Sequence, residues 1–307
     1  MSLFKPQEVI AKIEQGHEFK EAELSRLKLE QVAIDRAVFI NCYMRGALFR
    51  DVSCKEINFK HTNLSFAKFE GVNLEQANLE RTEFNSAFLV NTVLERANAY
   101  KAKLFGAKIK GIKAEEINLS DADLRQLSGD NVYLSSANLN RVFASQTTFS
   151  ELNLERATVT NAGFQSTTIV NSRWHRANLQ NSNFNQSKLI DAWFNDATLV
   201  NTKFSDAELN RIQFIGTELL ETNFCYSNFT DVDFTDSTIL SANFEGATLS
   251  NICLDNANLQ DSNFENTIWH NVTFNNCKVD GAVFSNAKGL TPEQKQWLKK
   301  NGALNIN

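Results

Sequence analysis

The residue types that most often perform catalysis or bind metals are few and scattered in this chain. Its histidines are His17, His61, His175 and His270, and none has a cysteine at a spacing typical of a zinc site or a nucleophilic Cys–His pair. Serine and aspartate are common throughout, so spacing alone supports no Ser–His–Asp grouping. No glycine-rich phosphate loop is present. The sequence therefore predicts no catalytic residue, no metal site and no cofactor, and we expect a protein that is not an enzyme.

A five-residue period organises the chain from Ala22 to Phe284. Positions ending in 4 and 9, beginning at Leu24, carry 21 Leu and 18 Phe in 53 repeats without an insertion or deletion. Two residues before each of these centres stands a small or β-branched residue, most often Ala, Thr, Val or Ser. None of the 31 basic or 36 acidic residues falls on either set of positions. Both sets must therefore point away from water.

This period fits extended chain and excludes a helix. A helix turns about 100° per residue, so a five-residue repeat would spread its apolar residues around the whole helix surface. In extended chain, residues two apart share a face, which turns the small residue and the centre inward together. The polar residues between them are rich in Asn, Asp, Ser and Gly, which are the residues that corners require.

A second period, of twenty residues, sets the number of corners in one coil. It predicts four repeats per coil and about 13 coils, in which like side chains stack on like and build one continuous core. Leu179, Leu199 and Leu219 begin an aliphatic column with this spacing. The predicted aromatic core column consists of Phe164, Phe184, Phe204, Phe224, Phe244, Phe264 and Phe284.

Several stretches carry a family resemblance. Ala-Asn-Leu-Gln at 177–180, Ala-Asn-Phe-Glu-Gly-Ala-Thr-Leu at 242–249 and Ala-Asn-Leu-Gln-Asp-Ser-Asn-Phe at 257–264 resemble the repeats of pentapeptide-repeat proteins. The resemblance implies an all-β fold, a right-handed quadrilateral β-helix (a β-solenoid) with four pentapeptides per coil. The handedness comes from the resemblance alone, because nothing in the spacing shows it.

We expect three segments along the chain. Residues 1–21 should hold a short capping helix, which Pro6 opens and Gly16 ends. Residues 22–288 should form the β-helix as one domain. Residues 289–307 should hold a second capping helix, with a capping box at Thr291 and a buried Trp297. Caps of this kind cover the open edges of the terminal coils.

The repeat is weakest between residues 99 and 144. There the centres Ala99, Ala114, Gly129 and Ala144 replace Leu or Phe at fifteen-residue spacing. This pattern predicts a weaker core with small cavities and lower local stability. Whether the segment also bends is left open by the sequence.

Cysteine use and hydropathy bear on location. Cys42, Cys54 and Cys277 fall on inward positions as small core residues, whereas Cys225 and Cys253 face outward and are not column neighbours. This pattern predicts a reducing, cytoplasmic compartment, with non-classical export as the open alternative. No run of eighteen apolar residues occurs, so we expect no membrane partner.

Two charged stretches suggest opposite partners. Nucleic acid would require basic charge gathered on one surface, preferably with aromatics. The basic residues from Arg96 to Lys113 point around most of the coil, so nucleic acid is not expected. Residues 191–265 have a net charge of −11, including the corner acids Asp191, Glu221, Asp231 and Asp261. Because the family includes rods that mimic DNA, the resemblance suggests an inhibitor or protector of a type II topoisomerase such as gyrase.

Outward apolar residues suggest a different function. Val200, Leu220 and Leu240 follow one another at twenty-residue spacing just after the centre, as Val170 and Ile190 do on another side, and Trp193 also faces outward. They are candidate contacts for a protein partner or a second copy, and the resemblance also implies a possible homodimer. Our first interpretation is a non-enzymatic scaffold or adaptor. The alternatives are the topoisomerase-binding DNA mimic and a bacterial effector or secretion-associated protein.

Overall fold

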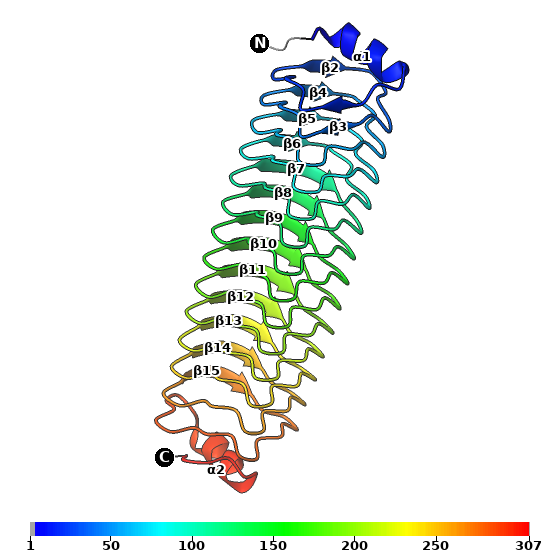
Figure 1. The fold of residues 1–307 in the computed structure, drawn as a ribbon. Coiled ribbons are helices and arrows are strands. Elements are labelled where there is room, and N and C mark those ends of the chain that lie inside the picture. Colours follow the sequence, from blue (N-terminus) through cyan, green and yellow to red (C-terminus); the bar gives the residue numbers. More distant parts are fainter. Residues whose placement is uncertain (1–3, 307) are drawn as a thin grey trace. The chain divides into compact units, whose positions relative to one another are not determined.

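The computed structural model describes residues 4–306. The chain divides into two compact units, residues 1–158 (unit 1) and residues 159–307 (unit 2). Each unit is a parallel β-solenoid that carries one short helix (Figure 1). The predicted solenoid fold is therefore confirmed, whereas the prediction that residues 22–288 form one domain stays a prediction.

Unit 1 begins with α1 (Pro6–Glu14) and a short parallel pair, β1 (Phe19–Lys20) with β3 (Phe39–Ile40). Its main ladder pairs each strand with the strand one coil later, in a twenty-residue register such as Phe49 opposite Phe69. The ladder consists of β2 (Lys28–Glu30), β4 (Leu48–Arg50), β5 (Lys68–Glu70), β6 (Phe88–Val90), β7 (Lys108–Lys113), β8 (Ser128–Tyr133) and β9 (Thr148–Asn153).

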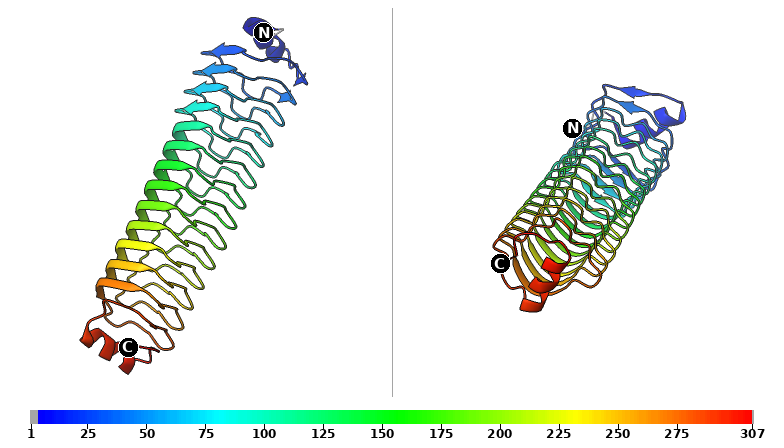
Figure 2. Two further views of the ribbon diagram at one scale, coloured as in Figure 1. Left: turned by 90° about the vertical axis from the view of Figure 1, so that its left-hand side faces the viewer. Right: turned by 90° about the horizontal axis from the view of Figure 1, so that it is seen from below.

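Unit 2 repeats this arrangement with strands of six residues, the length that β7, β8 and β9 already have, and ends in α2 (Pro292–Lys300). In each unit the ladder strands line one side of the coils (Figure 2), and isolated parallel bridges join the other sides in the same register. The ladder of unit 2 consists of β10 (Thr168–Arg173), β11 (Lys188–Trp193), β12 (Glu208–Gln213), β13 (Asn228–Asp233), β14 (Thr248–Cys253) and β15 (Ile268–Thr273).

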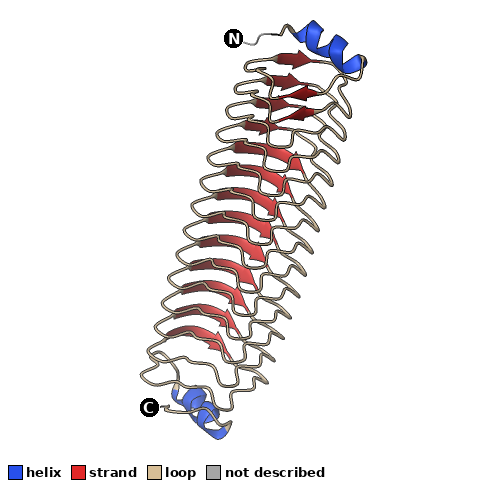
Figure 3. Cartoon of the chain, viewed as in Figure 1, coloured by secondary structure: helices blue, strands red, loops and turns tan. Residues whose placement is uncertain are grey.

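Turns make up much of each coil (Figure 3). Residues at positions ending in 1 and 6 turn the corners with positive φ, for example Asn181 at 61° and Asp196 at 57°. Asn, Asp and Gly adopt this conformation at the least cost, which explains their frequency there. Many corners are fixed further by an Asn side chain, as where Asn58 Oδ1 accepts a hydrogen bond of 3.0 Å from the Lys60 N–H.

The predicted aromatic column forms the core of unit 2. All seven of its Phe side chains are buried, and neighbouring rings stack with centroid separations of 4.8–5.2 Å. A second stack runs from Trp174 through Phe194 and Phe214 to Phe234. The twenty-residue register brings each ring onto the ring one coil later, so aromatic contacts add to the area that burial removes from water.

Many inward Ser, Thr and Cys residues donate a hydrogen bond to the backbone of the preceding coil, whereas others, such as Thr167, donate to the carbonyl three residues earlier. The Thr82 hydroxyl donates to the Phe59 carbonyl at 2.8 Å, and the Thr222 hydroxyl donates to the Leu199 carbonyl at 2.9 Å. The Cys277 thiol makes the same contact with the Leu254 carbonyl at 2.9 Å. Small hydroxyl residues are therefore compatible with the core because most of their buried hydroxyls have an acceptor, Ser187 being an exception.

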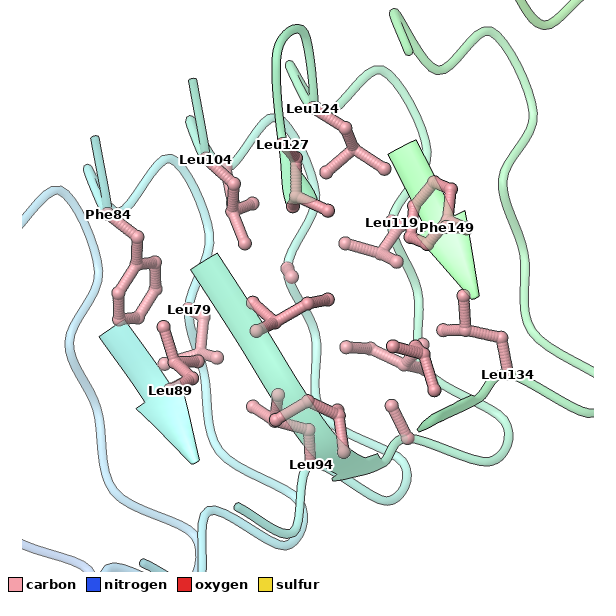
Figure 4. A pocket seen from close by; sticks show the side chains of 17 residues that line it. Leu79, Phe84, Leu89, Leu94, Leu104, Leu119, Leu124, Leu127, Leu134 and Phe149 are labelled. Carbon is pink, nitrogen blue, oxygen red and sulfur yellow. The ribbon is translucent and has the colours of Figure 1, made fainter. Parts of the chain in front are cut away.

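The core of unit 1 contains a cavity of about 50 Å³. Its lining is entirely apolar and comes from several successive coils, including Leu104, Leu119 and Phe149 (Figure 4). Of the four small centres, Ala99 and Ala114 line it, whereas Gly129 and Ala144 do not. The Phe149 ring occupies the space beside Gly129, since a Cβ added there would lie 2.5 Å from Phe149 Cδ1. The lower stability of this segment stays a prediction.

Both capping helices begin as the sequence predicts. Pro6 opens α1, and the Glu8 carboxylate accepts a hydrogen bond from the Lys5 N–H. At the start of α2, Thr291 and Gln294 form a reciprocal capping box. The predicted burial of Trp297 is wrong. Trp297 is half-buried and stacks on Phe274, and its neighbour Leu298 fills the buried position.

Candidate protein-interaction surface

The apolar ladder of unit 2 consists of Val200, Leu220 and Leu240. The backbone stacks them in consecutive coils, because the Asn201 N–H donates to the Leu220 carbonyl at 2.9 Å and the Glu221 N–H donates to the Leu240 carbonyl at 3.0 Å. All three side chains are half-buried. Residues at this position are half-buried in most coils whatever their type, so the half-burial of the ladder belongs to the coil position and its remaining surface is available to a partner.

A second apolar group lies on the strand side of unit 2. Val170 of β10 is opposite Ile190 of β11, and both are half-buried. Ile190 also lines a groove of about 230 Å³ that the sequence did not reveal. The Lys188 ammonium and the Glu208 carboxylate, 2.7 Å apart, lie in the wall of this groove. Trp193, at the end of β11, is half-buried between Arg173 and Gln213 of the adjacent strands.

The four candidate DNA-mimic acids occupy two different corners. Asp191 and Asp231 belong to the corner that follows the first half of the ladder strands, and Glu221 and Asp261 belong to the corner that follows the apolar ladder. All four have positive φ, between 53° and 57°. They therefore lie on corners, as predicted, but they do not form one acidic stripe.

Asp191 is also neutralised by a neighbour. Arg211, one coil later on the same corner, donates two hydrogen bonds to its carboxylate at 2.6 and 2.7 Å. These hydrogen bonds and the positive charge of Arg211 hold the pKa of Asp191 below its usual range. Asp231 accepts a hydrogen bond of 2.8 Å from the Asn251 side chain. This corner therefore presents less negative charge than its acids alone suggest.

The basic residues of the stretch 96–113 also contact different neighbours. Arg96, Lys103 and Lys110 form ion pairs with Glu75, Glu83 and Asp130. The ammonium groups of Lys101 and Lys108 lie over aromatic rings, those of Tyr100 and Phe88. Together with Lys113, these basic residues occupy six different positions of the coil, so they do not gather on one surface.

The histidine and cysteine side chains could form a metal site or a Cys–His nucleophile only where they lie close together. Within residues 4–306, no group of three or more His, Cys, Asp or Glu side chains is placed to hold a metal ion. Burial raises the pKa of the Cys277 thiol to about 12 and the pKa of Cys54 well above its usual value, so neither thiol ionises near neutral pH. In the same part of the chain, no helix is long and apolar enough to cross a bilayer.

Family models identify the repeat. The model for pentapeptide repeats matches residues 37–76, 57–96, 73–111, 130–165 and 252–288, and the model for a pentapeptide repeat region matches residues 187–264. Together the matches cover more than half of the chain. The chain is a pentapeptide-repeat protein. No curated protein sequence matches this pentapeptide-repeat protein.

Solved structures with low sequence identity resemble it. One is QnrB1, described as a plasmid-mediated fluoroquinolone resistance protein, with 20% identity, a TM-score of 0.40, and coverage of 69% of this chain and 94% of that one. Another is HetL, a pentapeptide-repeat protein involved in heterocyst differentiation regulation in Nostoc sp. strain PCC 7120. It has 19% identity, a TM-score of 0.20, and coverage of 92% of this chain and 97% of that one. At these scores neither likeness supports a functional argument.

Proposed function

We propose that this pentapeptide-repeat protein is a non-enzymatic scaffold that holds a protein partner against unit 2. The observation that carries the proposal is the ladder of Val200, Leu220 and Leu240, three outward aliphatic side chains in consecutive coils. Three rungs at ~4.8 Å per coil extend over roughly 10 Å, which is enough for the centre of a small interface but not for a large one. Val170, Ile190 and Trp193 are the alternative contact.

The test compares partner capture by wild type and a Leu220→Asp, Leu240→Asp double variant. A protein should be retained from the source organism's lysate at high salt by wild type and lost by the variant, because apolar contacts resist ionic screening. The captured protein is then purified and titrated directly by calorimetry.

A matched control separates the loss of apolar contact from added charge. Thr230→Asp with Ser250→Asp places two carboxylates at equally half-buried outward positions one coil apart, outside the ladder and on the strand-side column that also carries Val170 and Ile190. Equal loss of the partner in both double variants would contradict the ladder as the contact. Loss only with Val170→Asp and Ile190→Asp would move the contact to the strand side.

The DNA-mimic function is the second candidate, supported by the exposed corner acids Glu221 and Asp261. Against it, Asp191 is paired with Arg211 and the acids divide between two corners. Recovery of a topoisomerase only at low salt, unaffected by the ladder variant, would favour the mimic. Inhibition of gyrase supercoiling that Glu221→Gln with Asp261→Gln relieves would establish it. The bacterial effector alternative, the bacterial source and the cytoplasmic location stay predictions without further support.

A further inference from the structure

Five exposed aromatic side chains lie along one corner of unit 1. Tyr43 and Phe143 belong to one column of parallel backbone bridges, and Phe88 lies in β6 on the other side of the corner. Phe66 and Phe105 lie at the corner itself. Their exposed fractions are 55% for Tyr43, 47% for Phe66, 41% for Phe88, 39% for Phe105 and 56% for Phe143.

Basic side chains outnumber acidic ones around these rings. In unit 1, the coil positions that carry the rings hold three acids, Glu23, Glu83 and Asp123, and all three are half-buried. Lys103 pairs with Glu83, and Arg125 pairs with Asp123. The corner is therefore positively charged although unit 1 as a whole is balanced. The basic residues, all exposed, are Arg26, Lys28, Arg45, Lys68, Lys103, Lys108 and Arg125, and with the five aromatics they form the aromatic–basic ridge.

Three of the rings are each covered by a cation from an adjacent coil. The Arg45 guanidinium lies 4.3 Å from the centroid of the Phe66 ring, and the Lys108 ammonium lies 5.8 Å from that of Phe88. The Arg125 guanidinium lies 5.9 Å from the centroid of Phe105. Each pair joins an apolar ring to a fixed positive charge at the surface.

Phe66 occupies one of the corner positions that have positive φ throughout the solenoid, with a φ of 61°. Its ring is about half exposed, so the corner presents it to solvent.

We propose that the aromatic–basic ridge docks unit 1 onto an anionic lipid bilayer. Aromatic rings are favoured at the membrane interface, and Lys and Arg are attracted to anionic headgroups. Five coil steps from Tyr43 to Phe143, at ~4.8 Å each, give a line of contact of roughly 24 Å. The expectation of no membrane partner rested on the lack of a spanning segment, which docking on a surface does not need.

The shape of the ridge favours a bilayer over single-stranded nucleic acid. The ridge follows a corner, so it is convex, whereas single strands usually lie in a groove. In addition, cations already cover faces of the Phe66, Phe88 and Phe105 rings on which bases would stack.

The experiment measures flotation of the full-length protein with vesicles. Binding is expected with phosphatidylcholine vesicles that contain about 30 mol% phosphatidylserine, and not with phosphatidylcholine alone. Raising the salt from about 50 to about 500 mM should release the protein, because screening shortens the reach of the charges. Replacing Arg45, Lys68 and Lys108 by Gln should lower the partition coefficient by roughly a hundredfold.

An aromatic variant and a matched control test the rings. Tyr43→Ser, Phe66→Asn and Phe143→Ser should also abolish flotation, and Asn relieves the strain at residue 66, so this variant should remain folded by circular dichroism. Tyr226→Asn is the control, because Tyr226 is 60% exposed at the same coil position in unit 2, with a φ of 58°. It should float like wild type.

Three results would overturn the proposal. These are no flotation of folded wild type, equal flotation with both kinds of vesicle, and an equal loss with Tyr226→Asn. Binding of a twenty-nucleotide oligo(dT), lost in the ridge variants, without vesicle binding would assign the ridge to nucleic acid instead.

Discussion

Units 1 and 2 have the same backbone geometry, but different side chains stabilise it. Unit 1 has 21 basic and 21 acidic residues and joins successive coils by ion pairs, such as Arg50 with Glu70 and Arg141 with Asp121. Unit 2 has 10 basic and 15 acidic residues and joins many coils by amide hydrogen bonds, such as that from Asn271 to Asn251. Different pairs of outward side chains therefore join successive coils on the same backbone geometry.

The cores differ as well, and this difference matters more for stability. Unit 2 has two continuous aromatic stacks, whereas the core of unit 1 is interrupted by a cavity. Buried area and packing contribute far more to folding than exposed ion pairs do. We therefore expect unit 2 to be the more resistant unit, and the following variants test this expectation.

The largest effect should come from Phe204→Ala, which removes a buried ring from the middle of the first stack. Phe204 contacts Phe184 and Phe224 at centroid distances of 5.1 and 5.2 Å. The change should lower the free energy of unfolding by about 3–5 kcal/mol, measured by denaturant titration. Hydrogen exchange should accelerate in unit 2 more than in unit 1. Uniform acceleration in both units would contradict separate stabilities.

Gly129→Ala should be the next most harmful change. The new Cβ would lie 2.5 Å from Phe149 Cδ1 and 3.2 Å from Val132 Cγ2. Overpacking of this kind costs about 1–3 kcal/mol in the same titration. The second change Phe149→Leu should recover part of the loss, and failure to recover any of it would show that the Phe149 ring is not the cause.

Filling the cavity should have a smaller effect of opposite sign. Ala99→Val adds two carbons beside the space of about 50 Å³ and should raise the free energy of unfolding by about 0.5–2 kcal/mol. Ala144→Val is the control, because Ala144 is an equally small centre that is fully buried and does not line the cavity. It should destabilise the protein, and an equal gain from both changes would contradict a localised cavity.

The smallest effect should come from Arg211→Gln, which breaks the exposed ion pair with Asp191. Because the folded pKa of Asp191 is lowered, this pair stabilises the fold above the unfolded pKa, about 3.9. Its contribution is lost as the pH falls through the folded pKa. The variant should therefore unfold at a slightly lower denaturant concentration than wild type at neutral pH, and at the same concentration as wild type in strong acid. A difference that persists in strong acid would point to lost packing instead.

Much of this architecture could be predicted from the sequence because its two periods determine burial directly. The Phe column from Phe164 to Phe284 and the capping box at Thr291 follow from spacing and residue type alone. The aromatic–basic ridge does not follow from the order of charges along the chain, because its members come from four outward positions per coil. Phe88 and Lys108 become neighbours only because the coil length is twenty residues. The half-burial of Trp297 depends on how α2 packs, which no period encodes.

The hydrogen bonds from inward hydroxyls to the preceding coil have a consequence for how such a chain can change its length. Each bond joins a residue to the carbonyl 23 positions earlier, as from Thr82 to Phe59 and from Thr222 to Leu199. A duplication or deletion of twenty residues, or of a multiple of twenty, renews every such pair, whereas a change that is not a whole number of coils separates donors from acceptors within the core. Proteins of this kind should therefore grow and shrink over evolutionary time by whole coils, with the coil as the unit of inheritance.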